Sequence, residues 1–263
     1  MTTVATECGD LSKSILEELI EIVEPQAGFR TVADVRIGLG YTAVLLDSGA
    51  CGLAYSFRSE AGVTCSLLQE AGTLVGRPAS ELIHWLLKPN VLQSAVGLAT
   101  VNALVEPPGS HLVHGDLAEI LDVQPDWTVG MVGYFGPVIA KLRERVAWVL
   151  VFERRVTEEP DVYPDWAAFE LLPTCQAVVI SATTLINHTF DLLVQAASSA
   201  RVIAVLGPSA PLVSEPFLRR NVTHVSGVVV RDAGRVLEIV SQAGGTRNFK
   251  DAVERVNLVL DRA

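Results

Sequence analysis

The sequence predicts an α/β protein with two domains, a small domain over residues 1–106 and a parallel-sheet domain over residues 107–263. Two patterns carry this prediction. Before the proline-containing segment at residues 106–110, short extended segments are followed by helices, whereas after it apolar strands alternate with helices. Repeated strand–helix units with continuously apolar strands are typical of a parallel sheet covered on both faces. A chain of 263 residues is long enough for two such domains.

The small domain is expected to begin with an amphipathic helix over Asp10–Val23, capped by Asp10. Three short extended segments separated by glycines follow, at Val32–Ile37, Ala43–Leu46 and Cys51–Tyr55. Such segments are typical of an antiparallel meander. Helical patterns then cover Ala79–Leu87 and Val91–Val105, and Pro89 separates them because proline interrupts a helix. The small domain is therefore predicted to be α+β.

The second domain is predicted from apolar, β-rich segments that alternate with helical ones. The strands are expected at Thr128–Val132, Ala147–Phe152, Ala177–Ser181, Val202–Leu206 and Val225–Val230. The helices between them are expected at Pro137–Arg145, Asp165–Leu171, Leu185–Ser199 and Val213–Arg219. Two final segments, Asp232–Gln242 and Arg247–Leu260, are also predicted to be helical and to close the domain.

The composition favours a globular protein that neither binds nucleic acid nor inserts into a membrane. A net charge of −10 would repel a polyanion, and no apolar run approaches the roughly 18–20 residues that span a bilayer. The amino terminus lacks the basic start and apolar run of a secretory signal, which favours a cytoplasmic location. Four scattered cysteines indicate reduced thiols. The 49% of hydrophobic residues leaves room for a homo-oligomer interface.

Ligands of an open parallel sheet bind beyond the carboxyl ends of its strands, where loops and helix amino termini converge. The segments expected there carry glycines, hydroxyls, an amide and one carboxylate: Gly133–Gly136, Glu153, Ser181–Asn187, Gly207–Ser209 and Gly244–Thr246. These residue types predict a polar pocket that a ligand approaches closely.

The segment Gly130-Met-Val-Gly133-Tyr-Phe-Gly136 is a candidate phosphate loop. Glu153, 20 residues after Gly133, matches the ribose-binding acid of the dinucleotide fingerprint. The glycine spacing is G-x-x-G-x-x-G rather than G-x-G-x-x-G, and the aromatic side chains of Tyr134 and Phe135 would crowd a pyrophosphate. A dinucleotide site, a purely structural turn and a different small-molecule site all stay open, and the spacing favours the last.

Several segments together resemble one family. They are Gly133–Gly136, Val151–Glu153, Ile180–Asn187, Leu206–Ser209 and Ser241–Thr246, with Gly40–Val44 and Gly52–Ala54 in the first half. The series resembles the "putative heavy-metal chelation" domain family of uncharacterised prokaryotic proteins, over nearly the whole chain. The resemblance implies an enolase N-terminal-like domain followed by a Rossmann-like domain, with a ligand site in the cleft between them. It also implies heavy-metal chelation, metal uptake or cobalamin-related metabolism, with a metal ion or metal chelate as ligand.

The resemblance and the strand ends together place ligand-binding residues around this cleft. They are Asn102, Tyr134, Phe135, Thr183, Thr184, Asn187, Gly207, Pro208, Ser209, Gly244, Gly245 and Thr246. Thr183 and Thr184 are expected to begin a helix, where hydroxyls and amide donors suit a carboxylate or phosphate, although Thr184 is equally a candidate helix cap. Glu153 is the candidate general acid or base, because a carboxylate in a closed cleft can be tuned toward neutral pH.

A direct metal site has weaker support. The segment His111-Leu-Val-His114-Gly-Asp116 offers two imidazoles and a carboxylate, but H-x-x-H outside a helix is a weak pattern. We expect instead that a metal complex or organic chelator binds through neutral hydrogen-bonding groups. Two functions stay open: a small-molecule binding or processing protein, and a nucleotide-cofactor enzyme, either an NAD(P)-dependent reductase or an S-adenosylmethionine-dependent methyltransferase.

Overall fold

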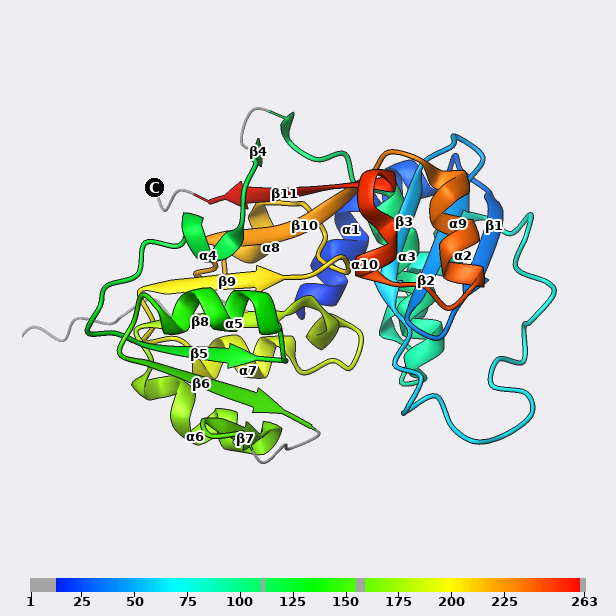
Figure 1. The fold of residues 1–263 in the computed structure, drawn as a ribbon. Helices are drawn as coiled ribbons and strands as arrows, with labels where there is room; N and C mark the ends of the chain where they lie inside the picture. The colour runs from blue at the N-terminus through cyan, green and yellow to red at the C-terminus, as the bar shows by residue number, and fades with distance from the viewer. Residues whose placement is uncertain (1–12, 110–111, 155–158, 261–263) are drawn as a thin grey trace, which may run out of the picture.

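A computed structural model describes residues 13–109, 112–154 and 159–260. In these residues the strands form two sheets, a three-stranded antiparallel sheet and an eight-stranded, mostly parallel sheet (Figure 1). The prediction of an α/β fold with one small and one large sheet is confirmed. The two sheets lie side by side, and the long segment after the small sheet loops along the outside of the molecule.

The small sheet has the order β1-β2-β3, formed by β1 (Val32–Ile37), β2 (Tyr41–Leu46) and β3 (Cys51–Tyr55). The helices beside it are α1 (Ile15–Ala27), α2 (Ala79–Ile83) with the 3-10 turn η1 (His84–Leu87), and α3 (Val91–Leu104). Asn90 begins α3 by accepting hydrogen bonds from the amides of Leu92 and Gln93. The antiparallel meander and both helices after it therefore lie where the sequence predicts them.

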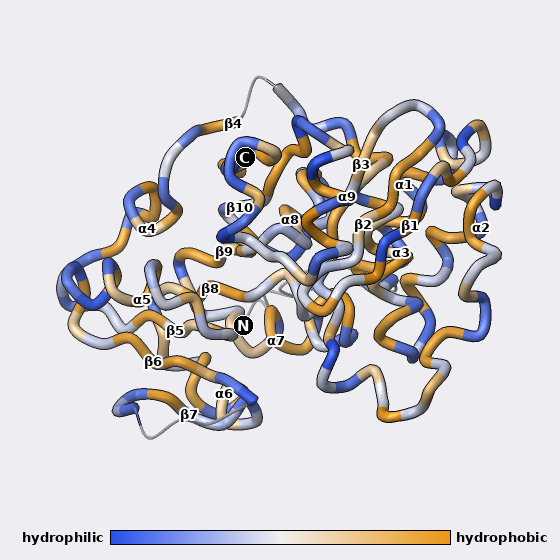
Figure 2. The backbone as a smooth tube through the Cα atoms, turned by 45° about the vertical axis from the view of Figure 1, so that its right-hand side comes forward, coloured by the Kyte–Doolittle hydropathy of each residue, from blue (hydrophilic) through white to orange (hydrophobic). Residues whose placement is uncertain are grey.

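The large sheet has the order β4-β11-β10-β9-β8-β5-β6-β7, and its six strands from β10 to β7 are parallel. Its strands are β4 (Leu112–Val113), β5 (Thr128–Val132), β6 (Trp148–Glu153), β7 (Val162–Pro164), β8 (Ala177–Ser181), β9 (Val202–Leu206), β10 (His224–Val230) and β11 (Val253–Val259). Hydrophobic stretches follow the central strands β8 and β9 in Figure 2, because both faces of the sheet are covered there.

Two layers of helices cover the large sheet. One face carries α4 (Leu117–Ile120) and α5 (Gly136–Arg143), packed on strand residues such as Met131 and Val179. The other face carries α6 (Ala168–Leu171), α7 (Phe190–Ala196) and α8 (Glu215–Leu218), together with α1 from the start of the chain. The 3-10 turns η3 (Asp165–Ala167), η4 (Leu172–Thr174) and η5 (Ala182–Leu185) connect these elements. A single hydrophobic cluster therefore joins α1, α2 and α3 to the large sheet.

The prediction of a helix over Arg247–Leu260 is wrong. A short helix, α10 (Thr246–Phe249), and the 3-10 turn η6 (Lys250–Ala252) precede strand β11. This strand pairs antiparallel with β10 over its whole length, from Val230↔Val253 to His224↔Val259. The apolar spacing of this segment fits both a helix and a strand, and its pairing with β10 makes it a strand.

Two predicted helices begin five residues later than expected. In the described residues the first helix starts at Ile15, because the Ser14 hydroxyl accepts the Glu17 amide and the Glu17 carboxylate accepts the Ser14 amide. Asp10 lies outside the described residues. The helix expected from Leu185 starts only at Phe190, since His188 has a φ of 61°, which a helix cannot contain.

The last part of the chain returns to the small sheet. Helix α9 (Ala233–Ser241) follows β10 and packs on the face of the small sheet opposite α3 (Figure 1). Val236 and Val240 of α9 belong to one hydrophobic cluster with Ala43, Leu53 and Phe249. The small sheet is therefore covered on both faces, on one of them by residues from the carboxyl-terminal end of the chain.

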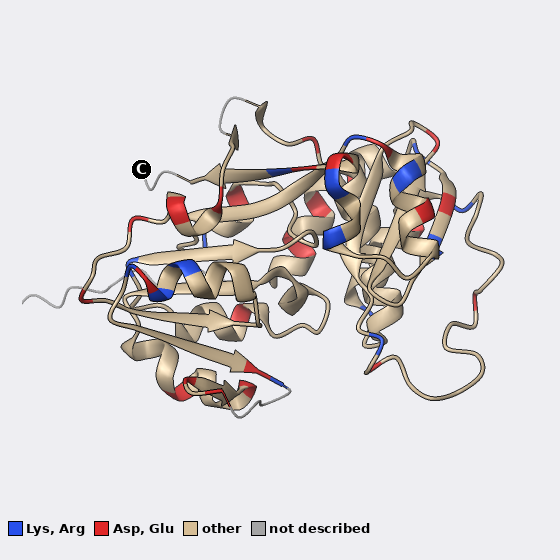
Figure 3. Ribbon diagram, viewed as in Figure 1, with Lys and Arg blue, Asp and Glu red and all other residues tan. Residues whose placement is uncertain are grey.

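Acidic and basic residues are interspersed along the ribbon in Figure 3, and Glu153 is followed by Arg154 at the end of β6. No helix within the described residues is both long and apolar enough to cross a membrane.

Candidate functional site

The strand order places a crevice between β5 and β8. The chain leaves β5 toward β6 on one side, whereas it leaves β8 toward β9 on the other. Loops that diverge in this way open a gap at the carboxyl ends of the strands, which is where ligands of open α/β sheets bind. Gly133 after β5 and Ser181 at the end of β8 line this gap, and the small sheet faces it.

The segment Gly130–Gly136 is not a continuous phosphate loop. Gly130 lies inside β5, where a Cβ would be 2.6 Å from a methyl group of Leu172. Gly133 makes the turn with a φ of 94°, and a Cβ there would be 3.0 Å from the Ser181 Cβ. The Phe135 ring lies beside both Gly133 and Gly207, so it forms a wall across the strand ends.

Glu153 at the end of β6 binds the backbone of this loop. Its carboxylate accepts the amide of Tyr134 at 3.1 Å and the amide of Arg154 at 2.9 Å. The Tyr134 amide is one that a phosphate would use, and here a carboxylate of the protein already occupies it. The Tyr134 hydroxyl donates to Glu159 at 3.0 Å, and this hydrogen bond raises the pKa of Tyr134.

The turn after β8 supplies hydroxyls and an amide. The hydroxyls of Ser181 and Thr183 lie 2.8 Å apart. Thr184 is buried and donates to the Ser181 carbonyl at 2.7 Å, so its hydroxyl holds the turn together. Asn187 Oδ1 accepts hydrogen bonds from the hydroxyl and the amide of Thr189. The side-chain nitrogen of Asn187 is therefore the group that can donate to a ligand.

The small sheet contributes an aromatic row to the other side. Tyr41, Tyr55 and Phe57 pack edge to face, with ring centroids 6.0 and 5.2 Å apart. Burial raises the pKa of Tyr41. Arg154 lies next to the last ring of this row: its guanidinium is 5.6 Å from the centre of the Phe57 ring and forms an ion pair with Glu60. Phe57 has a φ of 45°, which is unusual for a bulky residue and puts strained backbone beside the site.

These elements enclose a cavity of about 510 Å³ between the two sheets, within the size range of small-molecule sites. Nine of the predicted residues line it: Tyr134, Phe135, Glu153, Thr183, Thr184, Asn187, Gly207, Pro208 and Ser209. Ser181, which the strand ends also predict for this place, lines the cavity as well. The sequence analysis missed the remaining polar and aromatic lining residues, which are Tyr41, Tyr55, Phe57, Arg58, Ser59, Glu60, Phe152, Arg154, Asp165, Trp166, Phe169 and Thr189.

A signal for part of this missed set is present in the sequence. The segment after β3 follows a strand end with Ser56-Phe-Arg-Ser-Glu60, a mixture of hydroxyl, aromatic and charged groups like that after the large-sheet strands. Trp166 and Phe169 gave no such signal, because they lie on a short helical segment whose exposure depends on the tertiary structure.

Four predicted residues lie elsewhere. Asn102 lines a separate pocket on the other side of Pro208. Gly244, Gly245 and Thr246 line neither the cavity nor this pocket. A Cβ on Gly245 would be 3.5 Å from the Tyr41 ring, so this segment supports that ring from behind.

Direct metal ligands do not gather in the described residues, where no three His, Cys, Asp or Glu side chains form a group that could hold a metal ion. Of the H-x-x-H segment, His111 lies outside the described residues, His114 pairs with Glu254 at 3.4 Å, and Asp116 caps α4. The His188 ring lies 2.9 Å from the Leu86 carbonyl and does not line the cavity.

Two family models match the chain over residues 20–105 and 116–259, and both are described as "Putative heavy-metal chelation". The second, DUF364, matches more than half of the chain. The chain belongs to the DUF364 family.

Relatives of this DUF364 protein match nearly all of its length. It is 26% identical over 267 residues to an uncharacterized protein of Methanocaldococcus jannaschii, with 95% of this chain and 100% of the relative covered. A DUF364 family structure from Pyrococcus horikoshii, of unknown function, superposes with a TM-score of 0.80 at 23% identity over 94% of this chain and all of that one. Another, from Desulfitobacterium hafniense, gives 0.75 at 22% identity over 92% and 98%. These structures share the fold.

Proposed function

We propose that this chain binds a metal in the form of a small organic chelate, in the cavity between the two sheets. The observation that carries the proposal is the character of the cavity. It is walled by aromatic rings and bordered by hydroxyls and an amide, while direct metal ligands do not gather within the described ranges. A chelator would supply the metal ligands itself, and the description of the family supports a metal as part of the ligand.

Each wall has a chemical role in this proposal. The edge-to-face rings of the small sheet and the rim residues Trp166 and Phe169 offer faces for a flat, conjugated molecule. Thr183 and Asn187 would bind polar groups at its edge. The cavity borders also carry the carboxylates of Glu60, Glu153 and Asp165 against the guanidinium groups of Arg58 and Arg154. This balance favours a neutral or cationic complex.

The architecture of the two parts belongs to the same proposal. We infer a small enolase N-terminal-like domain and a Rossmann-like domain, divided near residue 106. The family models, which stop at residue 105 and restart at residue 116, support this division. In this arrangement α9 is a helix of the second domain that packs on the first.

The two exposed tryptophans give a matched test of the cavity. Trp166 is 64% exposed at the cavity rim, and Trp148 is 61% exposed at the amino end of β6, away from the cavity. We expect Trp166→Ala to weaken binding of a metal chelate roughly fivefold to tenfold, because one stacking face is lost. Trp148→Ala should leave the affinity unchanged. The affinities are measured by isothermal titration with free metal ions, free tetrapyrrole-type or siderophore-type chelators, and their metal complexes.

Two outcomes of this titration contradict the proposal. One is tight binding of a free metal ion with no gain from the chelator. The other is an equal effect of both tryptophan variants, which would place the ligand outside the cavity.

Glu153 separates this proposal from a nucleotide-cofactor enzyme. If the cavity held NAD(P) or S-adenosylmethionine, the cofactor would raise the melting temperature of the wild-type protein, and Glu153→Gln would abolish that rise. We expect no rise in the wild-type protein, because the Glu153 carboxylate already occupies the Tyr134 amide of the loop. A rise that depends on Glu153 would favour the reductase or methyltransferase.

Glu153 also remains the predicted general acid or base if the bound molecule is processed. When a ligand that the protein converts is used as substrate, Glu153→Gln is expected to stop turnover while the protein stays folded. Turnover at the wild-type rate would remove Glu153 from a catalytic role.

A further inference from the structure

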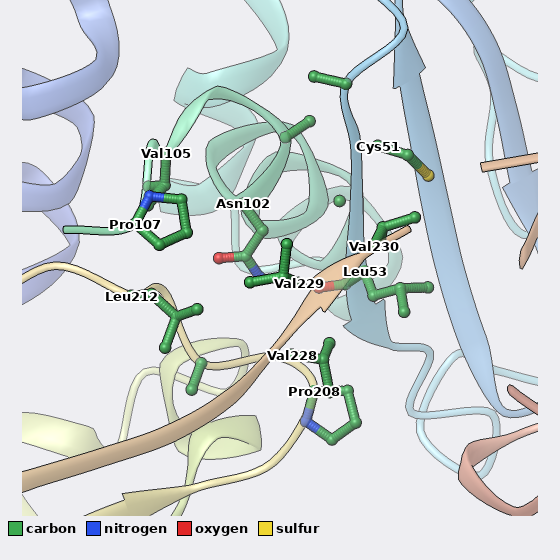
Figure 4. Close-up of a pocket in the computed structure, with 14 residues that line it drawn as sticks. Cys51, Leu53, Asn102, Val105, Pro107, Pro208, Leu212, Val228, Val229 and Val230 are labelled. Carbon is green, nitrogen blue, oxygen red and sulfur yellow. Dashed lines mark hydrogen bonds between the residues drawn. The ribbon is translucent and has the colours of Figure 1, made fainter. Parts of the chain in front are cut away.

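A second, smaller pocket lies across the Pro208–Ser209 loop from the cavity. It has a volume of about 140 Å³, close to the size of an engineered protein cavity that holds one benzene ring. Its walls come from both parts of the molecule: the end of α3 and the following linker, β3, and the carboxyl-terminal end of β10 (Figure 4). Side chains of Val105, Pro107, Leu212 and Val229 surround Asn102 in this view.

The Asn102 amide is fixed in one orientation. Its nitrogen donates to the Leu53 carbonyl at 2.8 Å and to the Ser209 carbonyl at 3.1 Å. The flipped amide would place its oxygen against two carbonyl oxygens, which repel it. Asn102 Oδ1 is therefore the atom that points away from both carbonyls, toward the pocket.

This oxygen is shielded from solvent and has no hydrogen-bond partner among the described residues. A buried acceptor without a donor is costly, and a group that donates to it recovers that cost. The side chains around the pocket are mostly apolar. Because solvent does not reach Asn102 Oδ1, a donor meets it only when one of the half-buried side chains of Val105, Pro107 and Val229 moves aside. The pocket thus combines an apolar surface with one unsatisfied acceptor.

We propose that this pocket binds a small, mainly apolar molecule with one hydrogen-bond donor, about the size of a single aromatic ring, which donates to Asn102 Oδ1. The site is distinct from the cavity and does not depend on the function proposed for it. The two are neighbours, because Ser209 accepts the Tyr55 amide on the cavity side and offers its carbonyl to Asn102 on the pocket side.

Phenol and toluene test this proposal, because they have the same number of heavy atoms and differ in the donor. Labelled wild-type protein is titrated with each, and the side-chain amide resonances of Asn102 are followed by NMR. We expect saturable shifts with both, and a dissociation constant for phenol that is roughly fivefold lower, since one hydrogen bond is gained. Unchanged Asn102 resonances, or equal constants for the two molecules, would overturn the proposal.

Variants at Val229 locate the binding. Val229→Phe should fill the pocket and make the Asn102 resonances insensitive to phenol, whereas Trp166→Ala at the main cavity should leave the phenol titration unchanged. If Val229→Phe does not fold, Val229→Ala serves instead: it enlarges the pocket, so 4-methylphenol should bind more tightly than to the wild type. A phenol response that is the same in all variants would place the binding elsewhere and refute the site.

Discussion

Replacing Arg220 with alanine is expected to destabilise the fold by about 3 kcal/mol, near the lower end of the range for removing one partner of a buried ion pair. Arg220 is 4% exposed and holds Glu18 of α1 at 2.9 Å and Asp191 of α7. The variant leaves the Glu18 carboxylate buried, and Arg219 compensates for this in part because it also contacts Glu18, at 3.1 Å. Denaturant unfolding followed by circular dichroism measures the loss.

An exposed ion pair provides the control for Arg220. Arg231 pairs with Glu254 on the surface, where its side chain is 59% exposed. Surface pairs of this kind contribute about 0–1 kcal/mol, so Arg231→Ala should change the free energy of unfolding by no more than that. If Arg220→Ala cost as little as Arg231→Ala, the buried network would not join α1 to the large sheet in the way described.

Replacing Gly52 with alanine is expected to cost about 3 kcal/mol or more, at or beyond the usual range for overpacking a core. A Cβ at this position would lie 2.0 Å from the Ala99 carbonyl oxygen and 2.4 Å from the Ala103 nitrogen. Both are backbone atoms of α3, so no side chain can move to make room. The helix would have to shift away from β3, which also displaces Asn102. Thermal unfolding measures this effect.

Gly109 is the matching control for Gly52. A Cβ at Gly109 meets nothing within 4 Å, so Gly109→Ala should change stability by no more than about 0.5 kcal/mol in either direction. A wild-type melting temperature for Gly52→Ala would show that α3 and β3 are not as closely packed as the structure has them.

Much of the fold can be predicted from short segments of the sequence. The strands β5, β8 and β9 have the predicted bounds because each is a short apolar run ended by glycine, serine or a turn. The site followed from a topological rule: residues at the carboxyl ends of those strands must meet, and nine of the predicted ones line one cavity.

The rest depends on tertiary contacts that a single sequence does not reveal. Strand β11 has an apolar spacing that also fits a helix, and its pairing with β10 decides between them. In the sequence, Arg154 looks like an ordinary surface charge after β6. In the structure it contacts Glu60 and Phe57, which both belong to the small-sheet part of the molecule. Asn102 was predicted for the main cavity, but the Pro208–Ser209 loop stands between that cavity and its side chain.

The return of α9 to the small sheet has a consequence for synthesis on the ribosome. The face of Ala43 and Leu53 is made early, whereas Val236, Val240 and Phe249, which cover it, are made at least 183 residues later. Until then the nascent protein carries an uncovered apolar surface, which is a site for chaperones or for aggregation. A fragment that ends before residue 249 would therefore carry the complete small sheet with one face only partly covered.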